Sequence, residues 1–199
     1  DYADTSQTHL SSTPTTSFPA DDPWVTSVGG TALNRNGLAF AESAWNQSGG
    51  GFSEFFPTPA YQAGLPADIQ NLAQKRRGVP DVSGNADPRT GLAMYEKGVW
   101  STAGGTSASA PLWAAIAAIA NQMAGHPLGF LNTALYKIEN GAHYTQDFHD
   151  ITVGNNSSSA GNVQVEGFSA VPGWDAITGL GTPNAVNLLP DLIAAQTGS

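Results

Sequence analysis

The stretch STAGGTSASAPLWAAIAAIA, residues 101–120, decides how the rest of this chain is organised. Its first half is rich in small residues, and Gly104–Gly105 permit a sharp turn because a residue without Cβ tolerates positive φ. Thr106 or Ser107 can cap a helix, and Pro111 fits a first helical turn, where no N–H is needed. The second half is apolar on every side, which predicts a buried helix. This apolar run is shorter than the roughly 18 residues of a membrane span.

A serine at the start of a buried helix has a chemical use. The unpaired N–H groups of the first turn and the helix dipole stabilise negative charge beside its hydroxyl. An acyl-transfer nucleophile needs this environment when the substrate carbonyl becomes an oxyanion. Ser107 is therefore a candidate nucleophile, and the alternative interpretation is that it only caps the helix.

Composition sets the broad class of the protein. The chain has 199 residues, 40% of them hydrophobic and only 12% charged, with 23 Gly and 13 Pro, which indicates one loop-rich globular unit. Its net charge of −9 argues against nucleic acid or an anionic membrane as partner. The absence of cysteine excludes disulfides and thiolate chemistry. No signal peptide or transmembrane run is visible.

Local patterns predict the other elements. Residues 48–53, SGGGFS, are interpreted either as a flexible loop or as a segment whose glycines approach another group closely. Alternating strands and helices favour an α/β fold with a mainly parallel sheet. The expected elements are a strand at Trp24–Val28 ended by Gly29–Gly30, strands at 39–45 and 79–82, a helix near 68–74, a hairpin of 91–95 with 99–102, and helices over 128–136 and 183–195, the last capped by Thr182 with Pro183 at its first position.

Four stretches of the chain resemble segments of the sedolisins, the serine-carboxyl peptidases related to subtilisin-like proteases, and they occur in the same order along the sequence. GTSASAP at 105–111 is similar to their nucleophile motif, and FPADDPWVTSVGGTAL at 18–33 to the strand before their substrate cleft. RGVPDVSGNADP at 77–88 resembles the strand before the nucleophile hairpin. The pair DI at 150–151 and the triplet GWD at 173–175 resemble the family's calcium site.

The resemblance runs from about Phe18 to the C-terminal helix and implies a subtilisin-like, mainly parallel sheet with flanking helices. Residues 1–199 would then form the C-terminal portion of one peptidase domain. Its nucleophile helix would cover about 106–124, and its calcium-binding loops about 150–175. The expected class is α/β, as a partial domain.

A serine nucleophile needs a base. No histidine of this chain lies in the His-Gly-Thr-His context of ordinary subtilisins. Sedolisins use instead a Glu and an Asp on a helix upstream of everything matched here, and carboxylates stay ionised at pH values that protonate histidine. The resemblance therefore implies acid-acting chemistry with two catalytic residues missing from this chain. The four histidines are His9, His126, His143 and His149.

The family also uses an Asp to help bind the oxyanion. The separation of Asp1 from Phe18 resembles the family's spacing, so Asp1 is the best match and Asp4 the alternative. In acid such a carboxyl can be protonated and donate a hydrogen bond, as an oxyanion hole requires.

The second constellation is the implied Ca²⁺ site. Its ligands would be the side chains of Asp150 and Asp175 and the carbonyls of Ile151, Val171 and Gly173. Calcium prefers such hard oxygen ligands, about six to eight of them. Val171 stands where a glycine is usual, which puts only the loop geometry in question. Without the resemblance, the two aspartates would read as surface carboxylates.

These observations predict the C-terminal part of an acid-acting serine-carboxyl peptidase that forms a serine acyl-enzyme through Ser107. Peptide or protein substrates and the upstream half of the same domain are the expected partners. A secreted protein, or one of a lysosome-like acidic compartment, is expected. The alternative is a catalytically silent calcium-binding domain or pseudoenzyme of the same fold. The chain should expose an apolar face or sheet edge that the upstream half covers.

Overall fold

The computed structural model describes residues 15–36, 39–160 and 163–198. The strands are β1 (Val28–Asn36), β2 (Ala39–Ala44), β3 (Gly51–Pro57), β4 (Arg76–Val79), β5 (Val82–Asn85), β6 (Leu92–Glu96), β7 (Val99–Ala103), β8 (Phe148–His149), β9 (Ser158–Ala160), β10 (Val163–Val165) and β11 (Thr182–Pro183). The helices are a 3-10 turn η1 (Ala60–Gln62), α1 (Ala67–Ala73), α2 (Thr106–Ala124), α3 (Asn132–Glu139), α4 (Tyr144–Asp147) and α5 (Ala185–Thr197).

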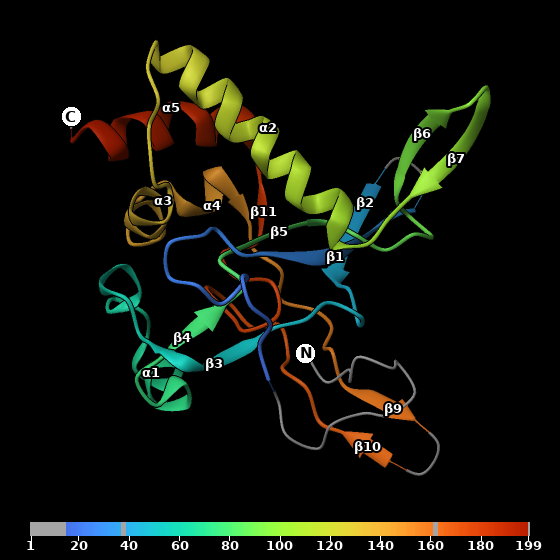
Figure 1. Cartoon of the computed structure of the whole chain (residues 1–199), viewed down its shortest axis with the longest axis horizontal. Helices are drawn as coiled ribbons and strands as arrows, with labels where there is room; N and C mark the ends of the chain where they lie inside the picture. The colour runs from blue at the N-terminus through green and yellow to red at the C-terminus, as the bar shows by residue number, and fades with distance from the viewer. Residues whose placement is uncertain (1–14, 37–38, 161–162, 199) are drawn as a thin grey trace.

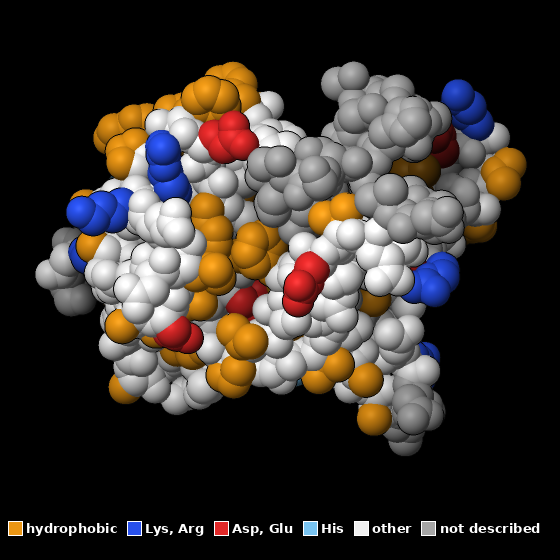
Figure 2. Space-filling view, turned by 90° about the horizontal axis from the view of Figure 1, so that it is seen from below, with side chains coloured by type: hydrophobic (Ala, Val, Ile, Leu, Met, Phe, Trp, Pro, Cys, Tyr) orange, Lys and Arg blue, Asp and Glu red, His pale blue; other side chains and the backbone are white. Residues whose placement is uncertain are grey.

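A small sheet in the order β2-β1-β5 lies at the centre of the chain. Helix α2 packs on β1 and β5, and α5 packs on α2 and α3 (Figure 1). Strands β3 and β4 with α1 form a separate group on the other side, and the β6–β7 hairpin extends away from the body. Figure 2, seen from below, shows a surface with sparse charged side chains and several exposed hydrophobic groups.

The β1–β5 pair is parallel, with Val28 opposite Val82 and Thr31 opposite Asn85. Within the described ranges the other strand pairs are antiparallel, several of them between neighbours in sequence. Short connections favour antiparallel pairing, whereas a parallel pair needs a long crossover. The expected mainly parallel character is therefore limited, in this part of the chain, to one pairing.

The prediction that Gly29–Gly30 ends the first strand is wrong. Strand β1 begins at Val28 and runs through both glycines, while residues 24–27 precede it in an irregular segment. A Cβ on Gly29 would lie 2.7 Å from Pro80 Cγ, and one on Gly30 would lie 2.6 Å from Ala86 Cβ. The glycines are therefore strand residues that permit close packing.

The structure also differs from the predictions at residues 79–82 and at the glycine run near residue 50. The single strand expected at 79–82 is two strands, β4 and β5, separated at Pro80, which has no N–H for a ladder. The glycine run near 50 is not a flexible loop, because Gly51 begins β3 and a Cβ on Gly50 would collide with the carbonyl of Ala176. The close approach that the glycines permit is to this chain's own backbone.

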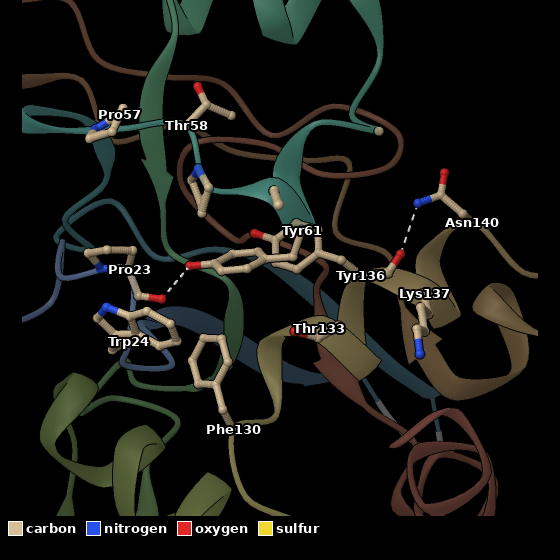
Figure 3. A pocket seen from close by; sticks show the side chains of 13 residues that line it. Pro23, Trp24, Pro57, Thr58, Tyr61, Phe130, Thr133, Tyr136, Lys137 and Asn140 are labelled. Carbon is tan, nitrogen blue, oxygen red and sulfur yellow. Dashed lines mark hydrogen bonds between the residues drawn. The ribbon is translucent and has the colours of Figure 1, made fainter. Parts of the chain in front are cut away.

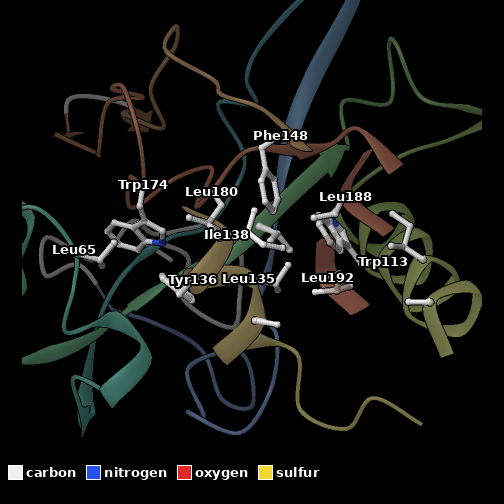
Figure 4. Packing of buried hydrophobic residues seen from close by; sticks show 14 of the residues in the cluster. Leu65, Trp113, Leu135, Tyr136, Ile138, Phe148, Trp174, Leu180, Leu188 and Leu192 are labelled. Atoms are coloured by element: carbon white, nitrogen blue, oxygen red, sulfur yellow. The ribbon is translucent and has the colours of Figure 1, made fainter. Parts of the chain in front are cut away.

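Helix α2 is half buried, which corrects the expectation of burial on all sides. Trp113, Ile116 and Ala120 face the core. Leu112, Ile119 and Met123, which form a stripe beside the buried face at helical spacing, are 39%, 46% and 55% exposed. Figure 4 shows the core, which continues through Leu135, Ile138, Phe148, Trp174, Leu180, Leu188 and Leu192.

Three local predictions are confirmed, and one boundary is wrong. Strand β2, helix α1 and the β6–β7 hairpin form where expected, and the hairpin turn places Lys97 and Gly98 at positive φ, as a two-residue turn requires. The last helix begins at Ala185 after Asn184, because residues 182–183 pair with β8 as strand β11. None of the helices in the described residues is long and apolar enough to cross a membrane.

Candidate active site and metal site

Ser107 lies at the edge of the sheet where the parallel strands end. Strand β5 ends at Asn85, and the carbonyl of the next residue, Ala86, accepts a hydrogen bond of 2.5 Å from the Gly105 N–H. Gly105 has φ +85°, a conformation that glycine adopts without strain. The chain thereby turns from β7 into α2 beside the end of β5, where its parallel pairing with β1 stops, and α/β folds place their sites at such an edge.

The side chain of Ser107 is exposed and does not cap the helix. Gly105 occupies the N-cap position, without a side-chain cap hydrogen bond. Pro111 lies in the second turn rather than the first, so the carbonyl of Ser107 lacks the N–H donor that position 111 would otherwise supply. The hydroxyl is thus presented at the positive end of a 19-residue helix.

Contacts to β5 fix the start of α2. Ser109 Oγ donates a hydrogen bond of 3.0 Å to the carbonyl of Gly84, and Trp113 Nε1 donates one of 2.9 Å to the carbonyl of Ser83. A Cβ on Gly84 would lie 3.2 Å from the Cβ of Ser109, so a glycine lets the helix approach this closely. The position of Ser107 therefore follows from rigid elements rather than from a mobile loop.

A base for Ser107 is not found in the described part of the chain, where its hydroxyl makes no hydrogen bond to a carboxylate or an imidazole. His126 contacts the carbonyl of Pro127, and His143 Nδ1 lies 2.7 Å from Asp191 Oδ2. His149 is 3.9 Å from Glu42. The contacts of these three histidines are with residues other than Ser107.

The oxyanion candidate Asp1, its alternative Asp4, and His9 lie outside the described residues. A cavity of about 180 Å³ adjoins Thr106, at the start of α2, and Pro80 and Gln47 also line it. Space for a side chain therefore exists next to the nucleophile candidate.

The structure brings the residues of the predicted calcium site together. The N–H of Gly173 donates to Asp150 Oδ2 at 2.9 Å, and the N–H of Val171 donates to Asp175 Oδ2 at 3.1 Å. Gly173 has φ +79°, whereas Val171 does not adopt positive φ, so the valine is accommodated without strain. Ile151 follows Asp150 and is buried.

The carboxylates of this site differ in how fully they are bonded. Asp175 accepts hydrogen bonds from Ile177, Thr178 and Val171, yet burial raises its pKa to about 6. Asp150 Oδ1 is buried without a partner. A buried, unpaired carboxylate oxygen is a hard ligand of the kind that fits Ca²⁺. No group of three or more His, Cys, Asp or Glu suited to a metal occurs in the described residues, so carbonyls would have to complete the shell.

The sequence of this chain is similar to those of known peptidases. The chain is 43% identical over 189 residues to kumamolisin from Bacillus sp. (strain MN-32), a match covering 90% of this chain and 33% of that protein. It is 37% identical over 191 residues to human tripeptidyl-peptidase 1, covering 88% and 33% respectively. No family model matches the chain.

A solved structure agrees with these sequence matches. The complex of Pseudomonas sedolisin, a serine-carboxyl proteinase, with two molecules of pseudo-iodotyrostatin superposes with a TM-score of 0.72 at 30% identity, over 87% of this chain and 47% of that one. The chain belongs to the sedolisin family. It has the α/β, subtilisin-like fold of that family and covers part of the reference domain. The chain spans about a third of the length of the curated relatives it matches.

Sequence reasoning missed the most heavily bonded group of this sedolisin chain. Arg77 and Asp81 form a fully buried ion pair, with Nη2 and Oδ2 2.7 Å apart. Both residues lie in the stretch 77–88, which was interpreted only as a strand. The signal that was present is an Arg and an Asp four residues apart inside an otherwise uncharged, strand-forming segment, because buried charges occur in pairs.

Proposed function

We propose that this chain is the nucleophile-bearing C-terminal part of an acid-acting serine-carboxyl peptidase. The observation that carries the proposal is the exposed Ser107 on the first turn of α2, at the carboxyl edge of the β1–β5 pair. Family membership supports peptide-bond hydrolysis as the reaction and peptides or proteins as substrates. A secreted protein or one of an acidic compartment fits this chemistry.

In this proposal Ser107 Oγ attacks the carbonyl carbon of the scissile bond and passes its proton to a base. The carbonyl oxygen becomes an oxyanion, which N–H groups at the start of α2 and the helix dipole stabilise. A Glu–Asp pair supplied from outside this chain is the proposed base, because the described residues offer the hydroxyl none. Asp1, or else Asp4, is the proposed oxyanion partner.

Calcium is the proposed stabilising ion of the same domain. Asp150 and Asp175 would hold it with the carbonyls of Ile151, Val171 and Gly173. The unpaired Oδ1 of Asp150 supports this assignment, since a bound cation would neutralise that oxygen. The ion would brace loops and take no part in the reaction.

The second candidate function is a catalytically silent calcium-binding domain of the same fold. The observation in its favour is the lack of a hydrogen-bonded base at Ser107 in the described residues. The two functions differ in what the upstream half of the peptidase domain would do. That half restores cleavage only if Ser107 is a working nucleophile.

The exposed face of α2 is the proposed seat of the upstream half. Leu112, Ile119 and Met123 form an apolar stripe along the helix that this chain leaves open. Apolar groups of this size favour association when a complementary surface is supplied.

The test is to express the chain alone and together with the upstream segment of kumamolisin, and to measure cleavage of denatured protein between about pH 3 and 7. We expect no cleavage by the chain alone, association with the added segment, and cleavage in acid by the pair. Ser107→Ala should abolish it, whereas Ser101→Ala, on the exposed hairpin, should not. Cleavage that survives Ser107→Ala would refute the assigned nucleophile, and an associated but inactive pair would favour the silent domain.

A further inference from the structure

One cavity of the described residues lies away from Ser107. It has a volume of about 800 Å³ and opens between the segment before β1, the η1 turn and the start of α3 (Figure 3). Its walls are mainly aromatic rings and prolines. Its lining includes Trp24, Pro57, Tyr61, Phe130, Tyr136 and Lys137.

The aromatic rings form one continuous wall. The centroids of Trp24 and Phe130 are 5.7 Å apart, those of Phe130 and Tyr61 5.7 Å, and those of Tyr61 and Tyr136 5.2 Å. The Tyr61 hydroxyl donates a hydrogen bond of 2.9 Å to the carbonyl of Pro23, which fixes that ring (Figure 3). Burial raises the pKa of Tyr61 to about 12, so the ring stays neutral. Trp24 is nevertheless 77% exposed, so a ligand can contact its ring.

A second cavity lies next to the first. It has a volume of about 330 Å³ and shares Pro57 and Thr58 with the aromatic cavity, and the two adjoining cavities are together called the groove. Lys75 and Arg76 line the second cavity, and Lys137 lines the first.

The charge of this groove is opposite to that of the chain. The chain has 16 acidic and 7 basic residues, yet three of the basic ones line the groove and, among the residues that the structure describes, no Asp or Glu does. Lys75, Arg76 and Lys137 form no ion pair within the described residues, and Lys137 Nζ donates to the carbonyl of Ala195. Unpaired positive charge around an aromatic wall favours an anionic ligand with an apolar body.

The groove is separate from the candidate active site. Trp24 precedes β1, which begins at Val28, whereas Ser107 lies where β1 and β5 have run to Thr31 and Asn85. The groove therefore lies toward the opposite end of the parallel pair from the nucleophile, and a peptide held there is not held in the position of a scissile bond.

We propose that this groove is a second peptide-binding site, which holds an acidic segment bearing an aromatic residue or a proline. The ring or pyrrolidine of the segment stacks on Trp24 and Phe130, and its carboxylates face Lys75, Arg76 and Lys137. Prolines and aromatic rings pair well on such walls because both are rigid and lose little conformational entropy on binding. The site needs no cleavage and is independent of the function assigned to Ser107.

The test measures binding of fluorescent peptides by anisotropy, with Ser107→Ala in the whole chain so that no cleavage interferes. The probe has a central Phe-Pro pair flanked by glutamates, and the matched probe carries lysines instead. We expect saturable binding of the acidic probe alone, weakened by added salt because screening shortens the reach of the charges. Trp24→Ala should weaken binding about tenfold, the effect of removing one central aromatic anchor.

Matched controls separate this site from general stickiness. Trp100→Ala removes another tryptophan, 70% exposed on the β6–β7 hairpin, and should leave binding unchanged. Arg76→Glu with Lys137→Glu should weaken the acidic probe about tenfold or more, whereas Lys97→Glu at the hairpin turn should not. Melting temperatures confirm that each variant is folded. Equal binding of the two probes, or equal losses in the hairpin controls, would overturn the proposal.

Discussion

Asp81 and Asp147 are both fully buried, yet their surroundings are opposite. Asp81 accepts five hydrogen bonds, which come from both terminal nitrogens of Arg77, the backbone N–H of Ser27, the Asn132 amide and the Tyr136 hydroxyl. Neither carboxylate oxygen of Asp147 has a hydrogen-bond partner. Asp150, three residues later, also has a buried oxygen without a partner, Oδ1.

The stability of the region around Asp81 should not depend on protons or cations from the solution, whereas that of the region around Asp147 and Asp150 should. The charge of Asp81 is neutralised by groups of the fold itself, so no proton or ion is needed there. Asp147 and Asp150 leave buried oxygens unpaired, which is costly unless a proton or a cation supplies the missing partner. The comparison predicts that damage to the first region is insensitive to pH and calcium, while the second responds to both.

The largest expected effect comes from Arg77→Met. Removing the guanidinium leaves the Asp81 charge buried without its main partner, which costs about 3–5 kcal/mol of unfolding free energy. Denaturant titrations in EDTA and in excess calcium should give the same loss. Arg89→Met removes an arginine that is exposed and pairs with Asp87, and should change stability little. A loss at Arg77 that calcium restores would break the contrast between the two regions.

Calcium should give the next largest effect, through Asp150. A cation that binds only the folded chain stabilises it by about 2.7 kcal/mol at a hundredfold excess over Kd. Thermal unfolding followed with calcium and with EDTA measures the increment. Asp150→Ala should remove it, and Asp68→Ala, at an exposed carboxylate in α1, should preserve it. Identical melting curves in calcium and EDTA for the parent chain would argue against the site.

Proton binding at Asp147 should give the smallest effect. Burial, with the negative charge of Asp191, raises its pKa to about 6, and His143 opposes this shift. Hydrogen bonding to Asp191 raises the pKa of His143, and Lys137 lines the same cavity. Because both pKa values are raised on folding, the folded state binds more protons. Their stabilisation is therefore complete below about pH 4 and is lost as pH rises through about 6 and above.

Asp147→Asn measures that contribution. In EDTA the parent should lose unfolding free energy from Asp147 as pH rises from 4 to 7, and the variant should lose less. Glu54→Gln, at an exposed position of β3, provides the matched control. Parallel pH profiles of parent and Asp147→Asn would mean that the unpaired oxygens of Asp147 do not govern stability.

Local sequence identified the elements whose causes are local. Gly98 between two strand-forming runs indicated the hairpin, whose turn has positive φ at Lys97 and Gly98, and the small-residue run before Ser107 indicated the turn into α2. The pattern failed where distant contacts decide. Gly29 and Gly30 look like strand breakers until Pro80 and Ala86 are packed against them. Thr182 looks like a helix cap until β8 pairs with it.

The sequence by itself determined the family, the position of the nucleophile candidate and the two aspartates of the proposed calcium site, because motifs keep their chemistry in consecutive residues. Only the tertiary structure decided which faces are covered. Helix α2 is apolar all round, and packing on β1, β5 and α5 buried one face and left Leu112, Ile119 and Met123 in solvent. The groove at Trp24 and the five bonds of Asp81 likewise join residues far apart in the chain, since burial and hydrogen bonding depend on distance in space.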